Sequence, residues 1–175
     1  MIQIRPETPA DFPNIRLLLQ AAFEGQEHSD QSEHLLVERL RQSPSYLASL
    51  AMVAEREGQL LGFILLTKIS ILEGERRFPS LALGPVAVWP EWQGQGIGAQ
   101  LIEAAHQEAR QLGHSSVVLL GHADYYPRFG YQAAHKYGIR LPFDLPPENC
   151  MVLPLTERAL DGVSGVVEYD AAFFA

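Results

Sequence analysis

Apolar and polar positions follow two repeating patterns along the chain, one with a period of two and one with a period of three to four residues. The first pattern predicts half-buried strands and the second predicts amphipathic helices. Strands are expected at 2–5, 50–55, 59–71, 80–88 and 115–120, from 131 onward, and at 150–155. Helices are expected after Thr8, at 33–41, at 96–112 and, briefly, at 124–129. This order predicts a mixed α/β fold with a central sheet of about seven strands and about four helices.

The helix expected at 96–112 has the clearest periodicity in the chain. Ile97, Leu101, Ala105 and Ala109 fall on one face, and Gly113 follows the last turn. Glycine is the usual residue just after a helix, because it adopts positive φ without steric cost. We therefore expect this helix to cover the sheet with its apolar face.

Glycine and proline divide the central strands. Glu57-Gly58 separates two apolar runs and predicts a hairpin. Gly84-Pro85 falls inside the strand expected at 80–88. Proline has no N–H group for the ladder, so a bulge there, or a separation from the neighbouring strand, is the expected result.

Composition predicts a single folded domain over residues 1–175. Hydrophobic residues make up 47% of the 175 positions and charged residues 19%, which is an ordinary balance for a globular core. The last segment, 156–175, is expected to pack on this domain as an extension or to cover an interface, so that both a monomer and a homodimer fit. The formal charge of −8 argues against a nucleic-acid or anionic-membrane partner.

Nothing at the start of the sequence predicts export or membrane insertion. The segment 1–6 lacks the cationic and apolar regions of a signal peptide, and no apolar run reaches the ~18 residues of a membrane span. Cys150 is the only cysteine, so no intramolecular disulfide is expected. We expect a cytoplasmic protein.

The segment 93–98, which reads Gln-Gly-Gln-Gly-Ile-Gly, is the densest local signal. Glycines allow close backbone approach to a ligand, and a helix N-terminus presents free N–H groups to an anion. The segment therefore suits a diphosphate, while a tight packing turn accounts equally well for the spacing. It is not a nucleotide-triphosphate loop, because Gly-Lys-Ser/Thr is missing. A dinucleotide fold is excluded as well, because no acidic residue ends the strand at 115–120.

Two motifs, one after the other along the chain, resemble those of the GNAT acetyltransferase superfamily. The first is Gln93-x-x-Gly96-x-Gly98, which follows a strand ending in Gly-Pro-Val-Ala-Val at 84–88. The second, at 125–131, reads Tyr-Tyr-Pro-Arg-Phe-Gly-Tyr. The similarity covers roughly residues 1–155 in element order, with its sharp motifs within 83–131. The chain is similar to a bacterial branch of uncharacterised small GNAT proteins.

The resemblance implies transfer of an acetyl group from acetyl-coenzyme A (acetyl-CoA) to an amine. It implies strands that splay to admit the pantetheine arm and a glycine loop that cradles the pyrophosphate. A backbone N–H near Val86 would meet the thioester oxygen, where charge builds as the amine attacks. The cofactor-binding residues implied are Val86, Ala87, Val88, Gln93, Gly94, Gln95, Gly96, Ile97, Gly98 and Ala99.

Tyr126 corresponds to the family's general acid, because it lies four residues before Gly130 of the aromatic motif. A free phenol has a pKa of about 10 and a thiol about 8.5, so full proton transfer to the leaving thiolate is uphill by roughly 2 kcal/mol unless the site lowers the phenol pKa. Packing of a short helix on the sheet accounts for the same tyrosine. We expect the acid role for Tyr126, and packing roles for Tyr125 and Phe129.

The general base is not evident from the motifs. Relatives often carry a glutamate early in the strand at 80–88, where this chain has Ser80 and then Leu-Ala-Leu. His122 is a candidate base after the strand at 115–120, because imidazole titrates near neutral pH; a backbone-bonded turn histidine is the alternative. Other candidates to accept the proton of the amine are Glu24, His28 and Glu33, which lie in the region that borders the acceptor pocket in the family. A water relay is a further possibility. The six histidines show no metal-ligand spacing, so no metal is expected.

Three functions remain open from the sequence. The first is an N-acetyltransferase acting on an amine-bearing small molecule or protein. The alternative is a catalytically silent coenzyme-A-binding sensor or interaction module, suggested by the missing carboxylate at 80–83. A structural α/β domain with a fortuitous glycine turn is the third. The residues specify neither the acceptor nor the length of the acyl chain.

Overall fold

The computed structural model, which describes all residues 1–175, contains nine strands in one mixed sheet. The strands are β1 (Gln3–Pro6), β2 (Ala51–Arg56), β3 (Gln59–Glu73), β4 (Arg76–Val88), β5 (Ser116–Leu120), β6 (Gln132–Ala133), β7 (Ile139–Arg140), β8 (Cys150–Pro154) and β9 (Gly165–Glu168). The main path runs β1-β2-β3-β4-β5-β8-β6, with β9 paired to β3 and β7 to β9. Neighbours are antiparallel except for β4–β5 and β7–β9.

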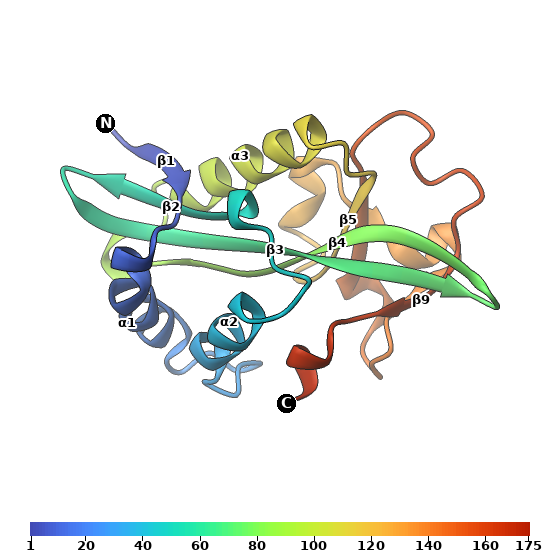
Figure 1. The fold of residues 1–175 in the computed structure, drawn as a ribbon, viewed down its shortest axis with the longest axis horizontal. Coiled ribbons are helices and arrows are strands. Elements are labelled where there is room, and N and C mark those ends of the chain that lie inside the picture. The colour runs from blue at the N-terminus through green and yellow to red at the C-terminus, as the bar shows by residue number, and fades with distance from the viewer.

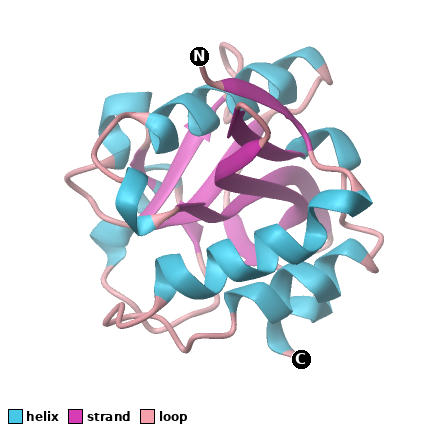
Figure 2. Ribbon diagram, turned by 90° about the vertical axis from the view of Figure 1, so that its left-hand side faces the viewer, coloured by secondary structure: helices cyan, strands magenta, loops and turns pink.

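Three α-helices cover the two faces of the sheet: α1 (Phe12–Phe23), α2 (Glu33–Arg41) and α3 (Ile97–Gln111). Figure 1 shows α3 on one side of the long β3–β4 ribbon and α1 with α2 on the other. The strands accordingly lie at the centre of the molecule, with helices on both sides (Figure 2). The apolar face of α3 packs in one core cluster, and α1 and α2 share a second with alternate residues of β2 and β3. The alternation of strand side chains therefore supplies two cores, as the period of two predicts.

Hairpin geometry confirms the predicted turn between the first two central strands. Glu57 and Gly58 both have positive φ, at 51° and 81°, which suits a two-residue connection. The next hairpin extends further than expected: its turn lies at Gly74, and β4 begins at Arg76 rather than at 80. Pairing from Glu73–Arg76 onward keeps this exposed end of the ribbon in register.

The counts of elements differ from the expectation. The helix expected at 124–129 is a 3₁₀ turn, Tyr126–Phe129, because Pro127 cannot continue a helical ladder. The strand expected from 131 has only two paired residues, in β6. β7 and β9 were not expected, because neither has a long alternating pattern. No helix combines the length and apolar character that a membrane crossing requires.

β4 separates from β5 where the proline predicts it. The parallel pairing between them is limited to Leu81–Val117 and Ala82–Val118. On the other side of β4, the register with β3 shifts between Ile64 and Leu66, opposite Gly84-Pro85. The sheet thus contains both a bulge and a splay, and the last six residues of β4 have no partner on the β5 side. This confirms the splayed mixed sheet.

The C-terminal segment joins the sheet through β9. Val167 pairs with Ile71 of β3 and is 1% exposed. The final 3₁₀ turn, Ala171–Phe174, lies against α2, where Arg39 Nε donates a hydrogen bond to the Ala172 carbonyl at 2.9 Å. Figure 1 shows this segment crossing below the ribbon, far from the N-terminal end of α3.

Candidate functional site

A cavity of about 610 Å³ lies at the splayed end of β4. The end of α1, the end of β4, the first turn of α3 and the aromatic turn after β5 together form its wall. Its lining residues are Ala22, Phe23, Gln26, Val86, Ala87, Val88, Trp92, Gln93, Gly94, Gly96, Ile97, Gly98, Ala99, Ile102, Tyr125 and Arg128. Every residue predicted for cofactor binding lines it except Gln95.

The backbone of Val86 and Val88 faces the gap that β5 leaves. Trp89 N–H donates to the Leu61 carbonyl at 3.0 Å, which makes these two residues a hydrogen-bonded pair. In antiparallel pairing such pairs alternate, so Ala87 also bonds to β3, opposite Phe63. Val86 and Val88 must then direct their N–H and C=O groups away from β3. β4 therefore presents to the cavity a backbone edge that no strand pairs, although its Val88 carbonyl accepts a side-chain hydrogen bond from Gln93.

The first turn of α3 presents free amides to the same cavity. Gly94 and Gly96 have φ of 78° and 83°, values that a side chain disfavours. None of the amides from Gln95 to Ala99 donates to a backbone carbonyl, as expected for the first turn of a helix. Gln93 Nε2 donates to the Val88 carbonyl at 3.0 Å and so ties the loop to β4. Free N–H groups and the positive end of the helix dipole create a site for an anion.

The aromatic turn places Tyr125, rather than Tyr126, on the cavity wall. The Tyr125 hydroxyl lies near Gly98, 4.0 Å from where a Cβ on that glycine would stand. Tyr126 is half-buried and is not part of the cavity lining, with its ring edge-on to Tyr125 at 5.0 Å between centroids. Burial, with a smaller contribution from Tyr125, raises the pKa of Tyr126 to about 12. Adjacent tyrosines look alike in sequence, and only the 3₁₀ geometry decides which one faces the cavity.

Arg128 is the charged member of the cavity lining. Its guanidinium carbon lies 4.3 Å from the centre of the Tyr125 ring, and its Nε donates to the Tyr125 carbonyl at 2.9 Å. The contact fixes a cation at the outer edge of the cavity. The sequence motif contains this arginine but does not reveal that it stacks on the neighbouring tyrosine.

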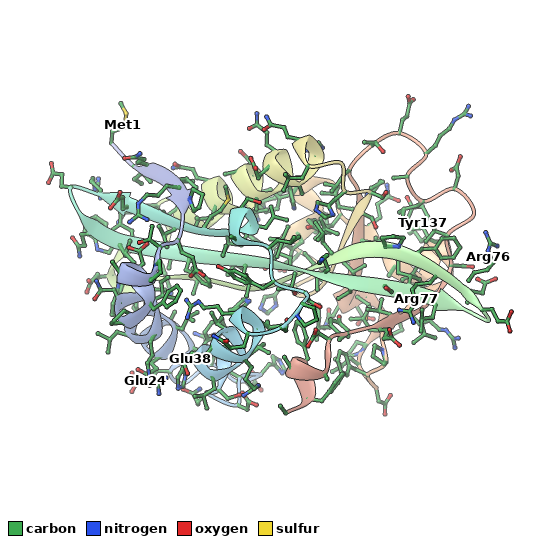
Figure 3. All side chains as sticks on the ribbon, viewed as in Figure 1. Met1, Glu24, Glu38, Arg76, Arg77 and Tyr137 are labelled. Atoms are coloured by element: carbon green, nitrogen blue, oxygen red, sulfur yellow. The ribbon has the colours of Figure 1, made fainter.

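The candidate bases lie outside the cavity lining. The His122 side chain is exposed, while its carbonyl accepts hydrogen bonds from the amides of Tyr125 and Tyr126 at 3.2 and 3.4 Å. Glu24 and His28 are exposed, and Figure 3 shows Glu24 at the outer rim of the molecule. Glu33 accepts from Ser29 Oγ within the α1–α2 loop. None of these four side chains belongs to the cavity lining.

Sequence reasoning did not identify several lining residues, because they come from elements far apart in the chain. Phe23 ends α1 and Gln26 lies in the loop that follows, Trp92 lies just before the glycine loop, and Ile102 lies one turn into α3. An amphipathic pattern identifies the buried face of each helix but not the part of it that borders a cavity.

Comparison with known proteins gives one consistent family. The acetyltransferase (GNAT) domain family matches residues 3–134. The chain is 31% identical over 170 residues to YhbS of Escherichia coli K12, an uncharacterised N-acetyltransferase, covering 97% of both proteins. It is 35% identical over 142 residues to E. coli YjhQ, another uncharacterised N-acetyltransferase, covering 80% of this chain and 75% of that protein.

Two solved structures share the whole fold. The crystal structure of E. coli YhbS in complex with CoA has a TM-score of 0.89 and 30% identity, covering 99% of this chain and 92% of that one. A GNAT family acetyltransferase from Brucella melitensis, in complex with acetyl-CoA, has a TM-score of 0.81 and 35% identity, covering 99% and 98%. With the domain match and this similarity along its length, the chain belongs to the GNAT acetyltransferase family.

Proposed function

We propose that this protein transfers an acetyl group from acetyl-CoA to an amine, which attacks the thioester directly. The observation that carries the proposal is the single cavity in which the unpaired edge of β4 meets the free amides of α3. Two relatives that share the fold were solved with CoA or acetyl-CoA. The acceptor is an amine-bearing small molecule or protein.

The residues present fit the two ends of acetyl-CoA. The glycine turn at 93–98 and the amides up to Ala99 suit the pyrophosphate, because they offer several N–H donors at the positive end of α3. The backbone groups of Val86 and Val88 suit the amides of the pantetheine arm. We assign the Val86 N–H to the thioester oxygen, where a donor stabilises the charge that develops during attack. Arg128 offers a cation to the other phosphate of the cofactor, the one outside the pyrophosphate.

Tyr126 is the proposed donor to the departing thiolate. A phenol with a pKa of about 12 lies about 3.5 pKa units above a thiol, so complete proton transfer costs roughly 5 kcal/mol. Full proton transfer would require the site to lower the pKa of the Tyr126 phenol, whereas burial raises it. We therefore propose that the Tyr126 hydroxyl stabilises the thiolate by a hydrogen bond without giving up its proton.

His122 is the proposed base, and we propose that it acts by an indirect route. Its exposed side chain lies outside the cavity lining, so the proton of the attacking amine reaches it through water. Neither His122 nor Tyr126 lines the cavity. This favours a second candidate function, a coenzyme-A-binding module that senses the cofactor without turning it over.

One assay separates these functions. The protein is incubated with acetyl-CoA and pooled amines, and free thiol is measured together with the melting temperature. Thiol release that depends on both the amine and Tyr126 supports the transferase. A melting temperature raised by acetyl-CoA without thiol release supports the sensor. If acetyl-CoA changes neither, the cavity is not a coenzyme A site and the proposal is wrong.

A further inference from the structure

A buried histidine on α3 contacts the aromatic turn through one hydrogen bond. His106 Nε2 lies 2.7 Å from Tyr131 Oη, and the two residues are 3% and 2% exposed. Tyr131 follows the 3₁₀ turn and immediately precedes β6. Neither residue lines the cavity. The bond therefore joins α3 to the aromatic turn from inside the core.

Both groups are neutral near pH 7, so the tautomer of His106 decides the direction of the bond. Burial raises the pKa of Tyr131 well above its usual value. Burial, with the positive charge of Arg110, lowers the pKa of His106 to about 4. A buried tyrosine hydroxyl needs an acceptor, so we assign the Tyr131 O–H as donor to His106 Nε2, with the ring proton on Nδ1.

Tyr131 is one of three aromatic neighbours of the Tyr126 ring, the other two being Tyr125 and Phe129. The two tyrosine rings meet edge-to-face, with centroids 5.9 Å apart and planes at 79°. On another side stands Gly121, where an added Cβ would come within 2.4 Å of Tyr126 Cε2. Gly121 admits the Tyr126 ring closely, and Tyr131 limits how that ring can turn. Tyr131 is thus one of the groups that fix the orientation of the Tyr126 ring and its hydroxyl.

We propose that His106 is a positioning residue, which holds Tyr126 in its working orientation through the hydrogen bond to Tyr131. Without an acceptor at position 106, the buried Tyr131 hydroxyl moves to find another partner, and Tyr126 follows it. The bond also ties the turn to α3, so that Tyr126 is held relative to the helix whose N-terminus carries the proposed pyrophosphate site. The inference rests on the proposed function, because it concerns the group proposed as donor to the thiolate.

Kinetics distinguish positioning from a general structural role. His106→Leu removes the acceptor and retains bulk, whereas His106→Gln retains an acceptor. We expect His106→Leu to lower kcat on the order of tenfold to a hundredfold, with KM for acetyl-CoA unchanged, and His106→Gln to restore most of kcat. In a Tyr126→Phe background, His106→Leu should cost nothing further. An equal loss of kcat in both backgrounds shows that His106 does not act through Tyr126, and overturns the proposal.

A spectroscopic test needs no substrate. The protein has six tyrosines, so fluorotyrosine labelling gives a resolvable fluorine NMR spectrum, assigned with Tyr126→Phe and Tyr131→Phe. We expect His106→Leu to shift the signals of both Tyr126 and Tyr131, and His106→Gln to leave them near the wild-type positions. If His106→Leu does not fold, Tyr131→Phe breaks the same bond and must shift the Tyr126 signal.

The two readouts separate this inference from the proposed function. A Tyr126 signal that does not move in a folded His106→Leu protein overturns the positioning role, whatever the turnover. A signal that moves in a protein whose wild type releases no thiol supports the positioning of Tyr126 by His106, and refutes the transferase function instead.

Discussion

Two neighbouring tyrosines occupy different surroundings, and their phenols are suited to different tasks. Tyr125 lines the cavity and lies under the Arg128 guanidinium. Tyr126 is more enclosed and has the raised pKa, so it stays protonated throughout the usable pH range. A hydroxyl that keeps its proton can serve as a constant hydrogen-bond donor. Tyr125 therefore lines the cavity, while Tyr126 is placed to act as the constant donor.

This division predicts unequal effects of removing the two hydroxyl groups. Tyr126→Phe should lower kcat on the order of a hundredfold with little change in acetyl-CoA affinity, because loss of one hydrogen-bond donor to the charge that develops in the transition state typically has that effect. Tyr125→Phe should be the milder change. Steady-state kinetics with a verified acceptor and calorimetry with acetyl-CoA measure the two quantities. A larger loss of kcat for Tyr125→Phe would transfer the donor role to the residue on the cavity wall.

His122 is tested by the pH dependence of its alanine variant. A lysine-like amine has a pKa of about 10.4 and must lose a proton before attack, so it needs a base at pH 7 but not at high pH. His122→Ala should therefore lose most of its rate at pH 7 and recover part of it in alkaline buffer. A uniform loss at all pH values indicates a structural role in the turn, and no loss leaves solvent as the route of the proton.

Burial of His106 should make the free energy of unfolding depend on pH. Its pKa is about 4 in the folded protein and near 6.5 in an unfolded chain, so between these values only the unfolded state binds the proton. The free energy of unfolding should fall as pH drops from 6.5 to 4, by roughly 3 kcal/mol in total. Urea unfolding at pH 7 and pH 4.5 measures the loss, which should be smaller in His106→Gln. Equal losses in both proteins would assign the acid sensitivity to other groups.

At the scale of elements, the turn before α3 needs glycine for two reasons, positive φ at Gly96 and open space beside Gly98. Gly96 needs positive φ, and its ideal Cβ meets no atom within 4 Å, so a side chain there would be strained and would project into open space. Gly98 has ordinary φ, with Val88 Cγ2 as its nearest neighbour at 3.8 Å. Its missing side chain therefore leaves room at the cavity wall for a ligand.

Glycine variants of this turn should bind acetyl-CoA more weakly while they remain folded. Gly96→Val and Gly98→Val both place bulk where the proposed pyrophosphate approaches the amides. The matched control is Gly74→Val, which imposes strain at φ of 60° in the β3–β4 hairpin, at the opposite end of β3 from its pairing with Val86–Val88. Calorimetry should show weaker binding for the first two only. Unchanged affinity in both loop variants would refute the assignment of the loop.

At the scale of the whole molecule, the chain end completes the sheet. β9 pairs with β3 at Ser70–Leu72, whereas the cavity end of β4 pairs with β3 at Gly62–Ile64. Gly165 begins β9 with φ of 128°, and a Cβ there would lie 2.1 Å from the Leu72 carbonyl oxygen. The close approach of β9 to β3 therefore depends on this glycine.

Gly165→Ala should destabilise the protein by about 1–3 kcal/mol, because the close approach and the special φ are both lost. Gly162→Ala is the control, since Gly162 also has positive φ but an open surrounding. Denaturant unfolding of the two variants measures the difference. Acetyl-CoA binding below the unfolding temperature should be unchanged in both. Equal stability of the two variants would show that β9 contributes little to the fold.

The sequence by itself determined the order of the main elements, the hairpin at Glu57-Gly58 and the bulge at Gly84-Pro85. These features depend on local properties: side-chain period, the φ freedom of glycine and the missing N–H of proline. The segment 93–98 was likewise recognisable, because the residues that form the loop are consecutive. The short strands β7 and β9 were not predicted, since two to four residues carry no usable period.

Only the tertiary structure decided which residues meet. It placed Tyr125 rather than Tyr126 on the cavity wall, brought α1 to the far side of the cavity, and put His106 against Tyr131. These contacts join positions far apart in the chain, or depend on a rotation of one 3₁₀ turn. They result from packing whole elements against a twisted and splayed sheet, and the packing of distant elements leaves no periodic trace in the sequence.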